Sequence, residues 1–156
     1  MQPTRDDFVT LAREHTVVPV WRELVADLIT PVAAFARLCP DGEPGFLLES
    51  VEHAERWGRW SFIGRRPMAT LTARGSQVSV TGDAGVELPT DQGILAAAEA
   101  LLAHHRAPVI AELPPLHSGL VGYLGYDVVR EVERLPSVPA DDAGHPDAVL
   151  SLLGEV

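Results

Sequence analysis

Short apolar runs, separated by glycine and proline, fill the middle of the chain and restrict it to a strand-rich fold. The four runs cover residues 45–51, 60–64, 69–73 and 78–80. Runs of this length, bounded by turn-forming residues, are typical of β-strands. The first has the length of a buried strand, and the last three are predicted to be consecutive antiparallel strands.

Helical patterns and further strands flank this region. Thr4 is a suitable N-cap for a first helix, with Asp6 and Asp7 in its first turn, near the positive end of the helix dipole. Pro31 begins a second helix, and the apolar spacing after Thr90 predicts the longest one, with Ile94, Leu95, Ala98, Leu101 and Leu102 on one face. The expected helices cover residues 4–15, 31–38 and 90–107, and the expected strands cover residues 17–21, 119–127 and 148–153.

Composition and charge limit the class of protein. The chain has 156 residues, of which 46% are hydrophobic, and its formal net charge is −10. This is enough apolar material for one core, and the charge repels phosphate backbones and anionic lipid headgroups. Cys39 is the only cysteine, and no signal peptide or membrane span is recognisable. We therefore expect a soluble cytoplasmic domain that binds neither nucleic acid nor a membrane.

Two groups of residues invite a functional interpretation that their spacing does not support. Gly119, Gly122 and Gly125 follow one another at intervals of three, whereas a dinucleotide-binding loop requires Gly-x-Gly-x-x-Gly before a helix. A strand whose backbone lies close to a neighbouring strand explains these glycines better. His104 and His105 are adjacent on a helix, point in different directions and are not expected to bind one metal ion together.

An acidic group overlaps the end of the first apolar run and extends beyond it. It consists of Glu49, Glu52, His53 and Glu55, and carboxylates at this density serve metal binding or acid–base chemistry, or are simply solvated. Glu49 and Ser50 belong to the apolar run itself, where an unpaired polar group would be costly to bury. Their partner is expected to be backbone, an arginine or a ligand. No ordered motif of a nucleophilic hydrolase is present.

Three ordered motifs resemble the N-terminal region of anthranilate synthase component I. They are Phe-Leu-Leu-Glu-Ser-Val-Glu at 46–52, Gly-Arg-Trp-Ser-Phe-Ile-Gly at 58–64, and Gly-Leu-Val-Gly-Tyr-Leu-Gly-Tyr-Asp at 119–127, followed by Arg130. Together the motifs and the lengths between them cover essentially the whole chain. The resemblance implies an α+β fold, in which antiparallel sheets pack together with flanking helices.

The resemblance also implies a role within a larger enzyme. Members of the family convert chorismate to anthranilate in tryptophan biosynthesis, require Mg²⁺, and receive ammonia from a glutamine amidotransferase subunit. Residues 1–156 correspond to the N-terminal regulatory domain, and no catalytic or metal-binding motif of the C-terminal chorismate-binding domain occurs among them. We therefore expect a fragment, incomplete without that domain, that is inactive alone, binds no cofactor, and self-associates through uncovered sheet edges.

The regulatory site of the family binds L-tryptophan as a feedback inhibitor. By resemblance, Leu48, Glu49 and Ser50 match the Leu-Glu-Ser element that contacts the inhibitor, and Arg59 and Trp60 are expected to form another wall. Trp60 replaces a tyrosine that is common in the family. A free amino acid requires an acceptor, donors and apolar walls, which these residue types supply. Aminodeoxychorismate synthase component I and a stand-alone small-molecule-binding module are the alternative identities.

Overall fold

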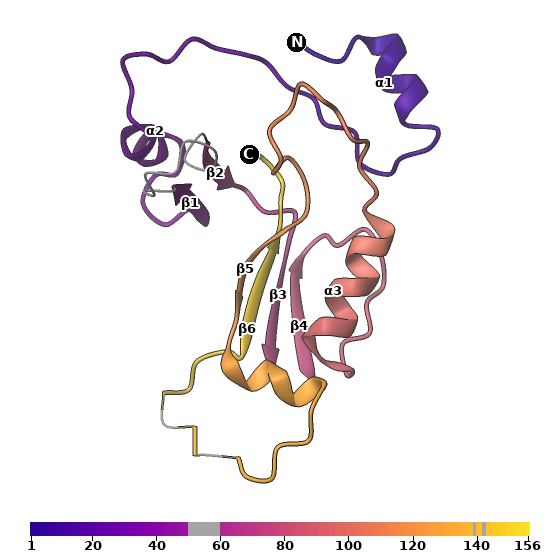
Figure 1. Cartoon of the computed structure of the whole chain (residues 1–156), viewed down its shortest axis with the longest axis vertical. Coiled ribbons are helices and arrows are strands. Elements are labelled where there is room, and N and C mark those ends of the chain that lie inside the picture. The colour runs from indigo at the N-terminus through magenta and orange to yellow at the C-terminus, as the bar shows by residue number, and fades with distance from the viewer. Residues whose placement is uncertain (50–59, 139, 142) are drawn as a thin grey trace. The chain divides into compact units, whose positions relative to one another are not determined.

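The described part of the chain forms two compact units. The computed structural model describes residues 1–49, 60–138, 140–141 and 143–156. Unit 1 comprises Met1–Pro67, His105–Gly119 and Leu153–Val156, and unit 2 comprises Met68–His104 and Leu120–Leu152. Helices and antiparallel sheets occur together (Figure 1), which confirms the predicted α+β class.

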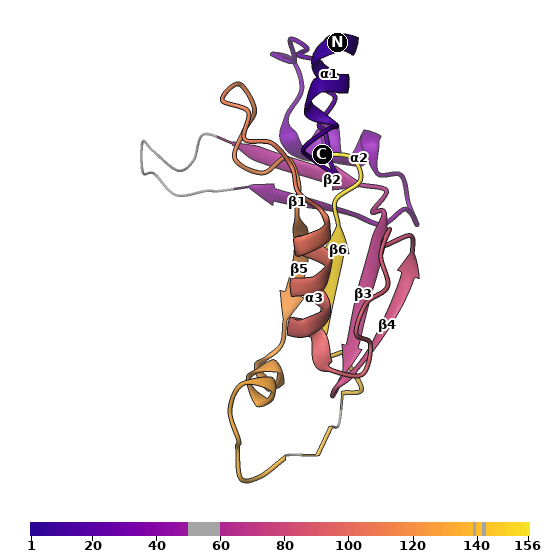
Figure 2. The ribbon, with the colours of Figure 1, turned by 90° about the vertical axis from the view of Figure 1, so that its right-hand side faces the viewer.

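Unit 2 is a four-stranded antiparallel sheet with one long helix on it. The strands lie in the order β4-β3-β6-β5. Helix α3 contacts β3 and β4, and a 3₁₀ helix, η1, follows β5 and contacts α3; Figure 2 shows α3 against one face of the sheet. The bounds are β3 Ala69–Arg74, β4 Gln77–Gly82, α3 Gly93–His104, β5 Leu120–Leu124, η1 Tyr126–Glu131 and β6 Ala148–Leu152.

The core of unit 2 lies between the sheet and α3. Ala69, Leu71 and Ala73 are buried, because alternate residues of β3 point to the same face of the sheet. Ile94 and Leu101 of α3 are fully buried and belong to the same cluster. Burial of one such side chain contributes about 1.5–3 kcal/mol, so this face of α3 holds the helix in place.

Strand β6 joins the two halves of this sheet, which are distant in sequence. Its register pairs Ala69 of β3 with Leu152, and Gly122 of β5 with Leu150. A Cβ at Gly122 would overlap the carbonyl oxygen of Val149, and one at Gly125 would lie 2.8 Å from that of Asp147. These contacts confirm close backbone approach at Gly122 and Gly125, whereas at Gly119, which has a φ of +121°, a Cβ would meet no atom within 4 Å and the interpretation is wrong.

Unit 1 contains two short helices and a two-stranded sheet. Thr4 caps α1 (Arg5–Leu11) by accepting from the Asp7 amide at 3.2 Å. Thr30 caps α2 (Pro31–Leu38) by accepting from the Ala33 amide at 3.2 Å. Strands β1 (Gly45–Glu49) and β2 (Ser61–Arg65) pair antiparallel, and α2 packs on both.

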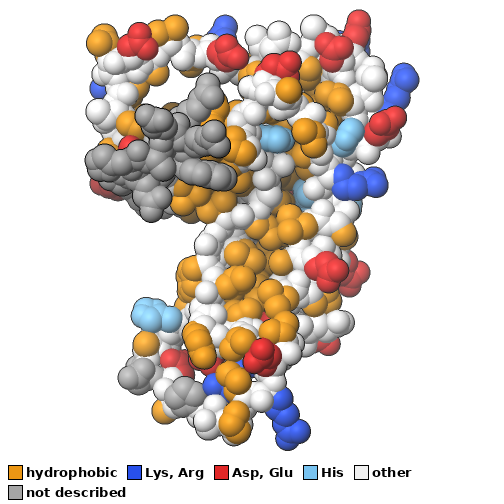
Figure 3. Space-filling model, in the orientation of Figure 1, with side chains coloured by type: hydrophobic (Ala, Val, Ile, Leu, Met, Phe, Trp, Pro, Cys, Tyr) orange, Lys and Arg blue, Asp and Glu red, His pale blue; other side chains and the backbone are white. Residues whose placement is uncertain are grey.

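Large hydrophobic side chains also reach the surface, and many are in view in Figure 3. In unit 1 they include Leu24, Val25 and Leu28, and in unit 2 they include Leu124 and Tyr126.

The structure corrects four sequence-based expectations. Residues 17–21 form no strand apart from a bridge between Gln2 and Trp21, because Pro19 has no amide hydrogen to donate. Strands β2 and β3 are consecutive in the chain but belong to different sheets. The first helix ends at Leu11 rather than near residue 15. Helix α3 begins at Gly93 and buries Ala97, while Leu95 and Leu102 are exposed.

Candidate ligand-binding site

The hairpin formed by β1 and β2 carries the described residues of the predicted tryptophan site. Leu48 pairs with Phe62 and Glu49 with Ser61, at the end of the ladder. Trp60 directly precedes β2. Leu48, Glu49 and Trp60 are therefore brought to the same end of the hairpin. Ser50 and Arg59, which complete the predicted site, lie outside the described residues.

Leu48 and Glu49 project from opposite faces of the hairpin, because successive side chains of a strand alternate. Leu48 shares its face with Phe46 and Phe62, and a Cβ at Gly64 would overlap the Phe46 ring. That face is apolar. A single ligand lying on it would contact the side chain of Leu48 directly and would reach that of Glu49 only around the edge of the hairpin.

The face that carries Glu49 is the one on which α2 ends. On this face a Cβ at Gly45 would lie 2.6 Å from Cys39 Sγ. The Arg65 guanidinium donates from Nη1 to the carbonyl oxygen of Leu38 at 3.0 Å. These contacts fix the last turn of α2 on the end of the hairpin opposite Glu49.

Exposure at this end of the hairpin corrects another expectation. The exposed fractions of Leu48 and Trp60 are 45% and 43%, and Glu49 is exposed as well. The expectation that the carboxylate of Glu49 is buried in an apolar strand is therefore wrong, since Phe46 and Leu47 of β1 are only half-buried and its other residues are exposed. What remains is a pair of half-exposed apolar side chains beside a solvated carboxylate.

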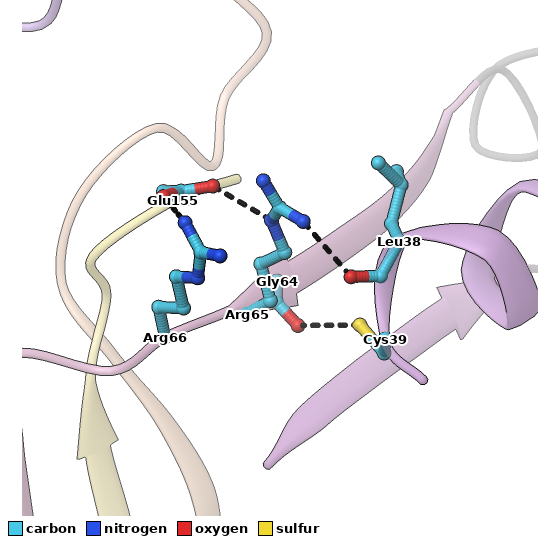
Figure 4. Close-up of polar contacts among 6 residues, drawn as sticks. All are labelled: Leu38, Cys39, Gly64, Arg65, Arg66 and Glu155. Atoms are coloured by element: carbon cyan, nitrogen blue, oxygen red, sulfur yellow. Dashed lines mark hydrogen bonds and ion pairs between the residues drawn. The ribbon is translucent and has the colours of Figure 1, made fainter. Parts of the chain in front are cut away.

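An ion network that the sequence interpretation missed anchors the hairpin at its other end (Figure 4). Arg65 Nε donates to Glu155 Oε2 at 2.6 Å, and Arg66 Nη1 donates to Glu155 Oε1 at 3.2 Å. The backbones of Arg65 and Glu155 also exchange two hydrogen bonds, of 2.9 and 3.1 Å. The hydrogen bond from Arg65 is the main reason that the pKa of Glu155 is lowered.

No signal in the sequence links Glu155 to the adjacent arginines, because the contact joins residues that are far apart in the chain. The network attaches residues 153–156 to the outer edge of β2 in unit 1. It holds the strand that carries Ser61 and Phe62 from the side opposite β1.

Metal binding and membrane insertion find no support in the described residues. Among them, no group of three or more His, Cys, Asp and Glu side chains is placed to hold a metal ion. Of the acidic group, Glu52, His53 and Glu55 lie outside the described residues. No helix in the described part of the chain is long and apolar enough to cross a membrane.

Comparison with known proteins identifies the relatives of this chain. No family model matches it. It is 43% identical over 153 residues to anthranilate synthase component 1 of Mycolicibacterium smegmatis, with 98% of the chain covered. It is 42% identical to the protein of the same name from Mycobacterium tuberculosis, and 32% identical to that from Acetivibrio thermocellus.

The chain is homologous to part of anthranilate synthase component 1. This confirms the resemblance inferred from the three motifs. The chain spans 29%, 30% and 31% of the lengths of these three relatives. More than two thirds of an anthranilate synthase component 1 of that size therefore has no counterpart in the 156 residues.

Proposed function

We propose that the chain is the N-terminal, tryptophan-feedback-binding part of an anthranilate synthase component 1. The observation that carries this proposal is the match to proteins of that name over 98% of the chain and about 30% of their length. The full-length protein converts chorismate and ammonia to anthranilate in the cytoplasm, with a glutamine amidotransferase subunit as the source of ammonia.

Residues 1–156 act in this proposal as a regulatory domain without chemistry of their own. The described residues do not fit a Mg²⁺ site, because no group of carboxylates among them is placed to hold a metal ion. By resemblance, metal and substrate binding are assigned to the C-terminal chorismate-binding domain of the full-length enzyme. The chain alone, given chorismate, Mg²⁺ and ammonia, is expected to form no fluorescent anthranilate above the blank without enzyme.

The end of the β1–β2 hairpin is the proposed tryptophan site. Leu48 and Trp60 supply half-exposed apolar surface for the indole ring, and contact between aromatic rings adds about 0.5–1.5 kcal/mol. By resemblance, Ser50 supplies a polar group for the charged ends of the amino acid, and Arg59 forms another wall of the site. Glu49 projects from the face opposite Leu48. Its proposed role is to accept a hydrogen bond from the ammonium group of the amino acid, which reaches the carboxylate around the edge of the hairpin.

Inhibition of the full-length enzyme by tryptophan tests this site. Loss of one hydrogen bond to a charged group costs about 1.5–3 kcal/mol, so Ser50→Ala is expected to weaken inhibition roughly ten- to a hundredfold. Leu48→Ala should weaken it as well. Leu24→Ala, at an exposed leucine elsewhere in unit 1, is the matched control and should leave inhibition unchanged.

Two results would contradict the proposal. Unchanged inhibition by tryptophan in both Ser50→Ala and Leu48→Ala would remove the hairpin from the site. A full-length protein that makes aminodeoxychorismate in place of anthranilate would assign the chain to the related enzyme.

A further inference from the structure

Strand β5 is the open edge of the sheet in unit 2. Its one neighbour among the described residues is β6. Gly125 N donates to Asp147 O at 2.7 Å and Leu153 N donates to Gly119 O at 3.0 Å. Because the direction of backbone groups alternates along a strand, the amides and carbonyls of Val121 and Tyr123 also point toward β6. The amides and carbonyls of Leu120, Gly122 and Leu124 therefore point outward.

The other edge of this sheet is partly covered. Asp83 N donates to Met68 O at 2.8 Å, so the backbone amides and carbonyls of the even-numbered residues of β4 point away from β3. Of these, Val78 N donates to Thr90 O at 2.8 Å, and Ser76 O just before β4 accepts from Gly93 N at 2.9 Å. The chain thus uses its own residues 90–93 to protect β4, and no described segment does the same for β5.

The sequence of β5 is uncharged and nearly symmetric about its central glycine. It reads Leu-Val-Gly-Tyr-Leu, without the lysine, proline or inward charge that usually protects an edge strand. Leu124 is 51% exposed and Tyr126, just after the strand, is 84% exposed. The nearest charged side chain, Asp127, is paired with Arg130 at 2.6 Å, so this edge carries little net charge of its own.

We infer that two copies of the chain pair antiparallel through β5 about a two-fold axis at Gly122. In this register, Leu120 of one copy faces Leu124 of the other, and the two Gly122 residues face each other. The outward groups at 120, 122 and 124 then find partners at 124, 122 and 120, as an isologous interface requires. The two four-stranded sheets become one continuous eight-stranded sheet.

Sedimentation equilibrium of the 156-residue chain tests whether the pair forms. A strand of five residues buries less surface than a standard stable interface, so the apparent mass should rise with concentration from 16.8 kDa toward twice that value. A mass that stays at that of the monomer up to millimolar concentration would overturn the inference.

A pair of variants separates edge pairing from general apolar association. Leu124→Lys places a charge on the proposed interface, and it should raise the dissociation constant at least tenfold. Leu28→Lys makes the same change at a fully exposed leucine of unit 1, and should leave the constant unchanged. Equal effects of the two substitutions would contradict pairing through β5.

Disulfide cross-linking tests the register, with Cys39→Ser as the background. In a mixture of chains with Leu120→Cys and chains with Leu124→Cys, the facing Cα atoms would lie about 5.5 Å apart, within the range for a disulfide. Each variant alone would place its two thiols roughly 13 Å apart, too far to bond. Cross-linking in the mixture alone supports the register, and equal yields in all three samples would refute it.

Discussion

The carboxylate of Glu131 closes the amino end of helix α3 directly over Gly93. Its Oε1 accepts from the Ile94 amide at 2.8 Å and its Oε2 accepts from the Leu95 amide at 2.9 Å. Gly93 has a φ of +88°, and a Cβ there would lie 2.6 Å from Oε1 of the same carboxylate. One side chain of η1 thus caps α3 from outside the helix.

Removal of this cap should destabilise unit 2. Glu131→Ala leaves two helix amides without their acceptor and removes a negative charge from the positive end of the dipole, which costs about 1–2 kcal/mol. Urea unfolding monitored by circular dichroism measures the change. Glu133→Ala removes an exposed carboxylate two residues away, and a loss of similar size in that control would refute the capping role.

A side chain at Gly93 should be tolerated less well than one at Gly75. Both glycines have positive φ, but a Cβ at Gly75 meets no atom within 4 Å, whereas one at Gly93 meets the Glu131 carboxylate. Gly75→Ala therefore costs only backbone strain, about 1–2 kcal/mol, and Gly93→Ala costs that strain and the displacement of Glu131. Equal midpoints of urea unfolding for the two variants would contradict this difference.

A Cβ at Gly122 should weaken the sheet itself. Gly122→Ala forces β5 away from the carbonyl oxygen of Val149, and overpacking of this kind costs typically about 1–3 kcal/mol. Amide hydrogen exchange should accelerate in β5 more than in β3, which lies on the other side of β6. Unchanged exchange in β5 would show that the strand can shift without loss of pairing.

Acid should release residues 153–156 from β2. The hydrogen bond from Arg65 lowers the pKa of Glu155 below its ordinary value of 4.5. A group whose pKa is depressed in the folded state stabilises that state above the unfolded pKa, and this stabilisation is lost as the pH falls through the folded pKa. The contact is thus complete at neutral pH and weakens progressively below about pH 4.5.

Exchange of the Arg65 amide reports on this release, since that amide donates to Glu155 O. Its protection should fall with the titration of Glu155 observed by NMR. In Glu155→Gln the acid-dependent loss should disappear, while in Glu133→Gln it should remain. An unchanged acid profile in Glu155→Gln would show that the carboxylate does not hold the segment.

Local chemistry explains which elements the sequence could predict. Helix α2 begins and ends where expected, because Thr30, Pro31 and the Pro-Asp-Gly turn after it act within a few residues. The place of β6 between β3 and β5 could not be predicted, since strand order depends on contacts between residues far apart in the chain. Residues 17–21 have the β-branched composition of a strand but find no ladder to join.

In the predicted site, too, local features could be predicted and features that depend on distant contacts could not. The resemblance groups Leu48, Glu49 and Trp60 in one site, and the pairing of β1 with β2 brings them to the same end of a hairpin. The burial expected for Glu49 was wrong because burial depends on what covers a strand, which its own sequence does not contain. Glu155, the anchor of β2, carried no local signal because its partners Arg65 and Arg66 precede it by 90 and 89 residues.

The central position of β6 sets the order of events during synthesis. Strand β3 and its hairpin partner β4 leave the ribosome first, but the strand that pairs with the other edge of β3 is made only after α3 and β5. Pairing between positions so distant in the chain is intrinsically slow. A nascent chain halted before residue 148 would hold β3 without its partner β6, so the four-stranded sheet of unit 2 must wait for β6 before it can form.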